Sequence, residues 1–493
     1  MILGARAPLS LLAVLAMSAG CSSSGSSPAS AGDAGAGDAG PSPATLTALR
    51  VSSGILRPPF DPSVMDYDVT SLNSLYPVSV TATTATSSAK LTIQGAAAKS
   101  GVASVLTLKP REDIETVVEM PGMASSTYTI HYVPSDFPAY TVTASAGAGT
   151  EDVLLTPDGE YVLIMDRSGA PLYYRTFLPN DVEDLQQTTL PDGGKMYSVA
   201  VGVTDPDGWT LGTDHVMDDH FQDVADYQLL PHAQHGTLPA EGHEFLLLGE
   251  QHYVTMSYVQ RTLDLSALNP SWGKQAQVMS NVFQEIDGSQ VLFEWDSANV
   301  PSLYADSTFA SSIGPTMLTD YLHLNSITID PSDGNFIVSF RHTSSIVKID
   351  RHTAAILWTL GGMEDQFGLT GPQIFSFQHH ARVQADGSIT VFDDGNNETP
   401  EQTRVLSFVL DEVNHKVTSF QVLYTRPASQ PPSGLMGSAT PLSGGRLFIG
   451  WGGWYTTDLA PAATEIVGGS PVWSMEFTTP GVFSYRALPV ALP

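Results

Sequence analysis

Apolar and polar residues alternate in short runs along most of the chain. In the first third, the clearest runs are residues 46–52, 67–70, 78–82 and 127–132. Apolar residues at every second position are typical of β-strands that bury one face. Because turn-forming residues separate these runs, residues 45–134 are predicted to form a β-sandwich domain.

A second pattern begins after residue 137. Strand-like segments that end in an aromatic residue recur, with the aromatics at Tyr173, Trp295, Trp358 and Trp473. Their separations are close to one or two multiples of about 60 residues, which is typical of a repeated four-stranded unit. Helical patterns are nearly absent. The sequence therefore predicts an all-β protein: an N-terminal β-sandwich followed by a six-bladed β-propeller over residues 135–493.

The N-terminus has the pattern of an export signal. Arg6 precedes an apolar segment at residues 10–17, and small residues at 18–20 precede Cys21, the single cysteine of the chain. This pattern predicts a lipoprotein signal peptide over residues 1–20 and lipidation of Cys21, with plain secretion as the alternative. Residues 21–44, rich in Ser, Gly, Ala and Pro, are predicted to form a flexible tether. The protein is thus expected to be exported and lipid-anchored in the cell envelope, on the outer-membrane or periplasmic side.

The charge of the chain narrows the choice of partners. Twenty-one basic residues stand against 51 acidic ones, for a formal net charge of −30. Such a surface repels nucleic acids and anionic lipid headgroups, so we expect no nucleic-acid partner. Any anionic substrate therefore needs a local cationic pocket, because the overall field opposes its approach.

Three histidines and one arginine are the strongest candidates for chemistry. His243, His323 and His379 each stand directly ahead of an alternating strand, and the last two lie about one repeat apart. Arg341 follows in the same repeat as His323, within an apolar run. Histidine side chains can attack as nucleophiles or move protons near neutral pH. A guanidinium pairs with two oxygens of a sulfuryl or phosphoryl group.

Longer motifs around these residues resemble a known family. They are HLNSI from residue 323, SFRHTSS from 339, ILWTLGG from 356, FQHHARV from 377 and DDGNN from 393. As a set, they are similar to the core of the bacterial PAPS-independent arylsulfotransferases, over roughly residues 137–490. Residues 45–134 resemble the cadherin-like β-sandwich modules of bacterial surface proteins, for which we expect a spacer or adhesive role.

The resemblance implies a reaction and a set of roles. The protein would be an aryl sulfotransferase that moves a sulfuryl group from an aryl sulfate ester to a phenol, without a cofactor. His379 matches the histidine that becomes transiently sulfurylated, His323 the acid/base histidine, and Arg341 the arginine that holds the sulfuryl oxygens. His243 matches a further histidine of the central funnel of the propeller, where the innermost strands of the blades converge. Because His380 follows His379 directly, it is the alternative nucleophile.

Other readings of the same residues remain open. The chain could be a non-catalytic, surface-anchored propeller that binds ligands or proteins, or an aryl sulfate hydrolase on the same scaffold. A segment at residues 213–244 holds five histidines among aspartates, which could bind a divalent ion. Its spacing matches no known ligand signature, so we interpret it as a polar loop over the funnel mouth. DDGNN is interpreted as a turn rather than a calcium loop, and no metal or cofactor is expected.

Overall fold

The structure of the protein is a computed structural model. The structure describes residues 43–52, 54–69, 78–106, 112–133, 137–205, 208–453 and 459–492. The predicted signal peptide, the lipidation site Cys21 and residues 22–42 of the predicted tether lie outside the described residues. Among the described residues, no helix combines the length and apolar character needed to cross a bilayer.

The N-terminal domain is a β-sandwich, as the alternating pattern predicted. One sheet has the strand order β1 (Leu46–Val51), β4 (Ser79–Thr84) and β7 (Ser104–Val105). The other has the order β2 (Leu56–Arg57), β3 (Asp66–Val69), β9 (Ser126–His131), β8 (Ile114–Glu119), β5 (Lys90–Ile93) and β6 (Ala96–Ala98). Every second side chain of β4 and β8 is buried, so apolar burial fixes the register of both sheets.

Most of the remaining described residues form six sheets, which are antiparallel except for the short parallel pairing of β23 (Thr319–Asp320) with β21 (Ala276–Asp287). The first combines β11 (Asp152–Pro157), β12 (Tyr161–Met165) and β13 (Pro171–Thr176) with β36 (Ser484–Val490). The second contains β14 (Asp181–Thr189), β15 (Lys195–Thr204), β16 (Thr210–Met217), β17 (Asp223–Tyr227) and β18 (Ala240–Glu241). The third contains β19 (Phe245–Leu247), β20 (His252–Leu263), β21 (Ala276–Asp287), β22 (Gln290–Asp296) and β23 (Thr319–Asp320).

The three remaining sheets follow in chain order. The fourth contains β24 (Leu324–Ile329), β25 (Phe336–Phe340), β26 (Ser345–Ile349) and β27 (Ile356–Gly361). The fifth contains β28 (His379–Val383), β29 (Ile389–Asp393), β30 (Arg404–Asp411) and β31 (Lys416–Thr425). The sixth contains β32 (Ser438–Leu442), β33 (Arg446–Gly450), β34 (Pro461–Val467), β35 (Ser470–Phe477) and β10 (Tyr140–Ala144).

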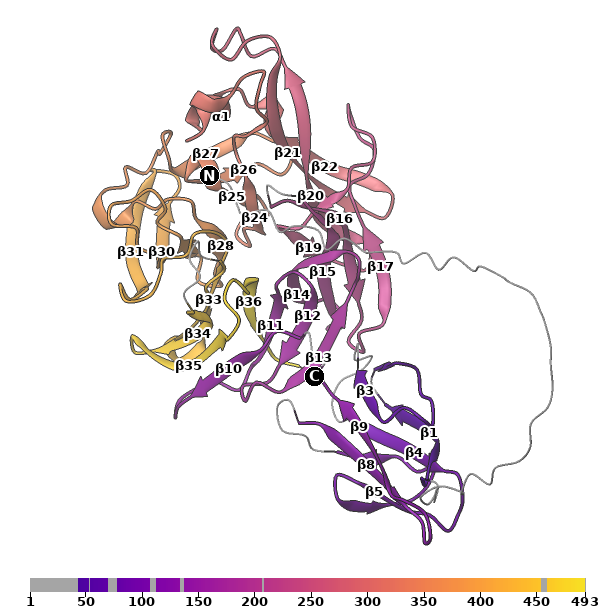
Figure 1. Cartoon of the computed structure of the whole chain (residues 1–493). Helices are drawn as coiled ribbons and strands as arrows, with labels where there is room; N and C mark the ends of the chain where they lie inside the picture. The colour runs from indigo at the N-terminus through magenta and orange to yellow at the C-terminus, as the bar shows by residue number, and fades with distance from the viewer. Residues whose placement is uncertain are drawn as a thin grey trace, which may run out of the picture.

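These sheets close into a ring, which is the arrangement of a β-propeller (Figure 1). Each sheet packs against the next, and the sixth packs against the first through β33 and β36. The C-terminal strand β36 pairs with β11, with Asp152 opposite Val490. The early strand β10 in turn joins the last sheet, with Tyr140 opposite Phe477. Strands from the beginning and the end of the propeller, β10 and β36, therefore close the ring. The predicted all-β class is confirmed.

The recurring aromatics pack between neighbouring sheets. Tyr173 on β13 stacks on Phe221 of the second sheet at a centroid distance of 4.0 Å. Trp295 on β22 stacks on Phe340 of the fourth sheet at 5.5 Å. All four of the recurring aromatics, Tyr173, Trp295, Trp358 and Trp473, are buried. The repeat seen in the sequence therefore reports sheet-to-sheet packing.

Candidate functional site

The three candidate histidines stand at the starts of innermost strands. His243 lies two residues before β19, His323 directly precedes β24, and His379 is the first residue of β28. The rings of His243 and His323 lie edge to face, with centroids 4.8 Å apart. Arg341 follows β25 in a short 3-10 turn, and its backbone N–H donates to the carbonyl of His323 at 3.0 Å. Closure of the ring thus brings together residues that are far apart in the sequence.

Each of these three imidazoles is held by a carboxylate on the same ring nitrogen. The Nδ1 atom of His243 lies 2.6 Å from Glu241, that of His323 lies 2.5 Å from Asp320, and that of His379 lies 2.6 Å from Asp394. Among the described residues, none bonds to the Nε2 atom of any of the three rings. With Nδ1 donating to the carboxylate, Nε2 keeps its lone pair for a nucleophilic or basic role.

The backbone around the site adopts unusual conformations. His323, Phe377 and His380 have positive φ values of 58°, 55° and 47°, which are uncommon for residues other than glycine. The carboxylate of Asp320 stabilises His323 in this conformation by accepting from its backbone N–H at 3.1 Å. Such strained residues gather at functional sites, where the surrounding structure holds them in place.

Arg341 supplies a buried cation without a carboxylate partner. Its Nη1 donates to Nε2 of His342 at 2.9 Å, and its Nη2 donates to the carbonyl of Gly434 at 3.2 Å. The guanidinium lies over the ring of Phe377, 4.6 Å from its centroid. Within the described part of the chain, Arg341 forms no ion pair and its Nε has no hydrogen-bond partner. A buried guanidinium without a carboxylate partner still has donors that could pair with an anion.

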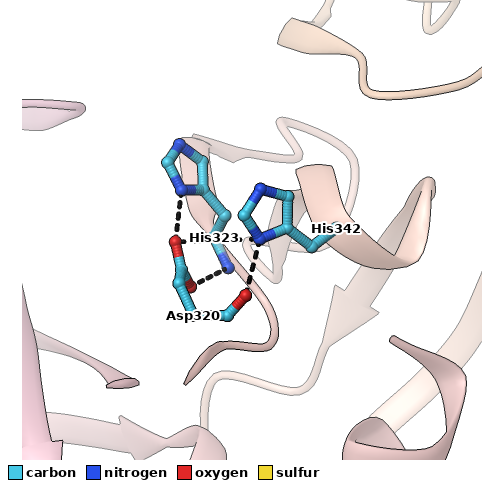
Figure 2. Close-up of side chains that lie close together, drawn as sticks. All are labelled: Asp320, His323 and His342. Carbon is cyan, nitrogen blue, oxygen red and sulfur yellow. Dashed lines mark hydrogen bonds and ion pairs between the residues drawn. The ribbon is translucent and has the colours of Figure 1, made fainter. Parts of the chain in front are cut away.

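His342, which accepts from Arg341, also contacts Asp320, and Figure 2 shows His342 beside Asp320 and His323. Because a guanidinium can only donate, Nε2 of His342 must accept, and its proton sits on Nδ1. That Nδ1–H donates to the backbone carbonyl of Asp320 at 2.8 Å. Asp320, His323 and His342 are close enough to surround a metal ion. Both nitrogens of His342 are already used, however, and a cation would sit beside Arg341, so the arrangement favours a hydrogen-bond network.

Burial and the neighbouring charges shift the pKa values of the three histidines in different directions. Burial, followed by the charge of Arg341, holds the pKa of His379 well below its usual range. Burial, His243 and Arg341 do the same for His323. Burial also disfavours the charged form of His243, but the carboxylates of Glu241 and Glu183 outweigh it and raise its pKa. His379 and His323 are therefore neutral near pH 7, as a nucleophile and a base require.

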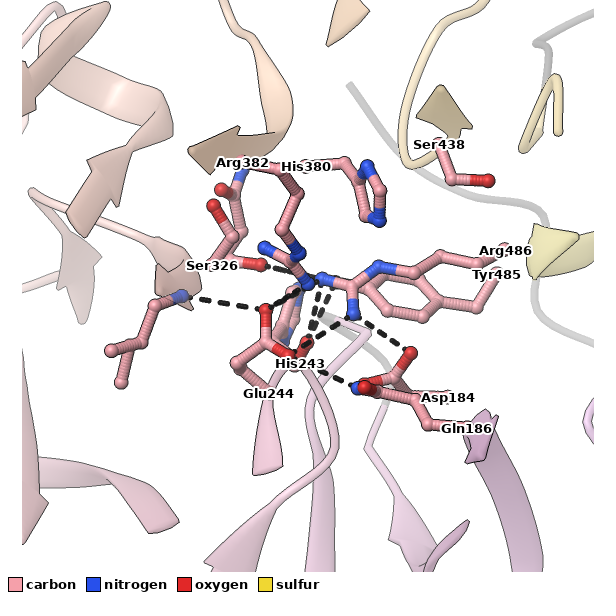
Figure 3. Close-up of polar contacts among 12 residues, drawn as sticks. Asp184, Gln186, His243, Glu244, Ser326, His380, Arg382, Ser438, Tyr485 and Arg486 are labelled. Carbon is pink, nitrogen blue, oxygen red and sulfur yellow. Dashed lines mark hydrogen bonds and ion pairs between the residues drawn. The ribbon is translucent and has the colours of Figure 1, made fainter. Parts of the chain in front are cut away.

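His380 lies in different surroundings from His379. The register of β28 shifts between His379 and Arg382, and the left-handed backbone of His380 falls within this shift. Its Nδ1 accepts from the backbone N–H of Ala439 at 3.3 Å, so its proton belongs on Nε2. Figure 3 shows His380 beside Arg382 and Arg486. The structure thus places His243, His323 and Arg341 together, couples His379 to them electrostatically, and gives His380 a different neighbourhood.

The sequence analysis did not single out several residues that build the site. They are Glu241, Asp320, His342, Asp394 and Phe377. A signal existed for some of them, because Glu241 and Asp320 stand two and three residues before the histidines that they hold. Asp394 lies within DDGNN, which was interpreted only as a turn. Its role as the partner of His379 depends on strand pairing, which the spacing does not reveal.

The histidine-rich segment does not form one metal centre. His215 contacts Asp226 and Asp223, His232 contacts Glu294, and His235 contacts Asp296. His220, at an exposed turn, contacts Asp219. Of these five histidines, only His243 lies at the site that contains His323. An exposed group of Asp218, Asp219 and His220 could hold an ion, but the other histidines of the segment pair with separate carboxylates.

A buried ion network lies beside the histidine site (Figure 3). Arg486 on β36 donates to Asp184 at 2.8 Å and to Glu244 at 3.2 Å. It also donates to the backbone carbonyls of His243 and Asn325, at 3.0 Å each. Burial raises the pKa of Asp184 to about 6 against the opposing charge of Arg486. The C-terminal strand therefore joins the sheets that carry two of the candidate histidines.

Replacing Arg486 with methionine is expected to cost about 3–5 kcal/mol of folding stability, because it leaves the buried carboxylate of Asp184 without its cation and Glu244 with Arg382 alone. Chemical denaturation of both proteins would measure this. The matched control is Lys90→Met, which breaks the exposed pair with Glu119 and should cost at most about 1 kcal/mol. Equal losses of folding stability in the two variants would contradict the conclusion that Arg486 joins these sheets.

The fold and the site together define an all-β propeller protein with an N-terminal sandwich and a buried cluster of histidines beside an arginine. Comparison with known families agrees. The arylsulfotransferase (ASST) model matches residues 187–454, and the cadherin-like beta sandwich domain model matches residues 46–134. The chain belongs to the arylsulfotransferase family. This membership supports a sulfotransferase-like enzyme that acts on small aryl substrates.

Other comparisons found only distant similarity. A search of curated proteins found no match. Among solved structures, a protein of unknown function from Bacteroides caccae is 11% identical with a TM-score of 0.40, covering 69% of this chain and 99% of its own. A quinonprotein alcohol dehydrogenase-like protein from Bacteroides thetaiotaomicron is 10% identical with a TM-score of 0.35, covering 89% and 99%. Similarities this low carry no argument about function.

Proposed function

We propose that this protein transfers a sulfuryl group from an aryl sulfate ester to a phenolic acceptor through a sulfohistidine. One observation carries the proposal: a guanidinium without a carboxylate partner lies beside imidazoles whose Nε2 atoms are open. Arg341 receives the anionic oxygens, and its two-pronged geometry suits a sulfuryl group. The global charge of −30 makes such a local cation necessary for an anionic substrate.

In the first half-reaction, Nε2 of His379 attacks the sulfur atom. An N–S bond forms, the S–O bond to the aryl group breaks, and the electron pair leaves with the phenolate oxygen. Asp394 holds Nδ1 of His379 and fixes the ring for this attack. Arg341 stabilises the charge on the non-bridging sulfuryl oxygens, which is the main demand of this type of transfer.

Proton transfer falls to His323. The bound anion offsets the positive charge of Arg341, which favours the protonated form of His323. His323, which is neutral in the free protein, takes up a proton from water when the substrate binds and gives this Nε2 proton to the departing phenolate. In the second half-reaction, it removes the proton of the acceptor phenol, whose oxygen attacks the sulfur and releases His379. The cycle therefore returns both histidines to their initial states, and His243 adds positive charge beside His323.

This chemistry needs no nucleotide donor, which suits an exported enzyme. The predicted lipidation at Cys21 would anchor it in the cell envelope, and the sandwich would hold the propeller away from the membrane.

A transfer assay with p-nitrophenyl sulfate and phenol tests the proposal. We expect the rate of nitrophenol release to rise with phenol concentration, and phenyl sulfate to form in equal amount. Nitrophenol release without phenyl sulfate would instead identify a hydrolase that passes the group to water. Release no faster than that of a His379→Asn variant would favour the non-catalytic binding protein.

A further inference from the structure

A segment beside the site is fixed at both sides of one exposed aromatic residue. The segment joins β22 to β23 and contains η1 (Ser297–Asn299), α1 (Ser302–Asp306) and η2 (Ala310–Ser312). The backbone N–H of Thr308 donates to the carbonyl of His342 at 2.8 Å. Trp272 donates through Nε1 to the carbonyl of Ala310 at 2.9 Å. Phe309, between these two anchors, therefore has a defined position relative to the candidate site.

The ring of Phe309 faces the site and is still open to solvent. Its centroid lies 4.6 Å from that of His342, in an edge-to-face arrangement, and 6.3 Å from that of Phe377. Despite these two contacts, Phe309 is 37% exposed. Leaving so large an apolar surface in water is unfavourable, and aromatic rings gain from edge-to-face or offset contact with another ring.

Phe309 and Arg341 contact the same two residues, His342 and Phe377. Arg341 donates to His342 and lies over Phe377, while Phe309 packs against both of these rings. In an aryl sulfate, a single ester oxygen joins the anionic group to the aromatic ring. An anion held by Arg341 therefore carries its ring into the neighbourhood of Phe309.

We propose that Phe309 is a specificity-determining residue that contacts the aromatic ring of the substrate. The inference rests on the proposed function in one respect, since it takes Arg341 as the place of the sulfuryl group. Beyond that function, Phe309 would make the site select aryl over alkyl esters. Phe309 lies in the segment between β22 and β23, outside the family motifs that carry His323, His379 and Arg341.

Binding of two unreactive sulfonates tests this directly. Benzenesulfonate and methanesulfonate both present three sulfonate oxygens, but their sulfur is bonded to carbon and cannot be transferred. Isothermal titration calorimetry should show tighter binding of benzenesulfonate to the unaltered protein. One aromatic contact is expected to account for about threefold to tenfold of that preference.

Three variants separate a contact from a general disturbance. Phe309→Ala should lower the preference for benzenesulfonate by about threefold to tenfold, and Phe309→Tyr should retain it. The control Val413→Ala removes a side chain that is 91% exposed, on the turn between β30 and β31, and should change neither affinity. In turnover of p-nitrophenyl sulfate, Phe309→Ala should raise KM by a similar factor and leave kcat nearly unchanged.

The outcomes distinguish this inference from the proposed function. Absence of benzenesulfonate binding to the unaltered protein, or an equal preference in Phe309→Ala, would overturn the inference even if sulfuryl transfer is observed. Loss of both sulfonate affinities in Phe309→Ala would also overturn it, because the residue would then only shape the site. A preference that depends on Phe309 in a protein that performs no transfer would support the aromatic contact and reject the reaction.

Discussion

Replacing His379 with asparagine is expected to lower the rate of sulfuryl transfer by at least about a thousandfold. The variant lacks the Nε2 lone pair that forms the N–S bond in the proposed reaction. Asparagine keeps a polar side chain opposite Asp394, so the buried carboxylate retains a hydrogen-bond donor. Initial rates with p-nitrophenyl sulfate and phenol measure the loss, and circular dichroism checks that the variant is folded.

The matched control for this variant is His380→Asn. The side chain of His380 accepts from the backbone N–H of Ala439, and the asparagine oxygen can accept in its place. We expect a rate reduction of less than about tenfold, in line with the small net value of a single hydrogen bond. If His380→Asn were the inactive variant and His379→Asn the active one, the two histidines would exchange roles.

Replacing Arg341 with alanine is expected to lower kcat/KM by about a hundredfold to a thousandfold. The variant loses the donors that stabilise charge on the sulfuryl oxygens. It also loses the positive charge that opposes the effect of burial on Asp394, whose pKa is already raised. The pairing of Asp394 with His379 then weakens. Steady-state kinetics of transfer measure both consequences together.

Arg341→Lys separates the charge from its geometry. Lysine restores a positive charge but not the planar fork that donates to two oxygens, so we expect it to recover only part of the lost rate. Full activity in Arg341→Lys would show that the fork is unnecessary. Full activity in Arg341→Ala would remove the anion site on which the proposed reaction depends.

The sequence predicted the class of fold because burial leaves a periodic trace. Alternation at every second residue identified the strands, and the aromatics at Tyr173 and Trp295 recur because each packs against the following sheet. Closure of the ring was harder to foresee. It depends on the pairing of β36 with β11 and of β10 with β35, and these strands lie more than 300 residues apart.

The sequence located the histidines but not what holds them. His243, His323 and His379 could be recognised because each stands directly ahead of an alternating strand, at the same end of its sheet. The partner of His379 is Asp394, fifteen residues away on the far side of a hairpin. Its neighbour His380 could be told apart only by a left-handed backbone and a register shift, which residue types do not encode.

The segment between β22 and β23 shows that substrate recognition was equally hard to predict from the sequence. The segment lies in the interval between His243 and His323, and nothing in the composition of this interval pointed to the site. Phe309 reaches the site because the backbone of Thr308 bonds to that of His342, a contact that any residue type at position 308 except proline could make. Contacts of this kind follow from the fold alone.

The proposed reaction passes through a covalent bond between His379 and a sulfuryl group. Its most direct test is mass spectrometry of the protein after brief exposure to p-nitrophenyl sulfate without acceptor, followed by peptide mapping under conditions that preserve N–S bonds. We expect the mass gain of one sulfuryl group on the peptide that contains His379, and its loss when phenol is added. An unmodified protein that nevertheless forms phenyl sulfate, or a sulfuryl group on another residue, would contradict it.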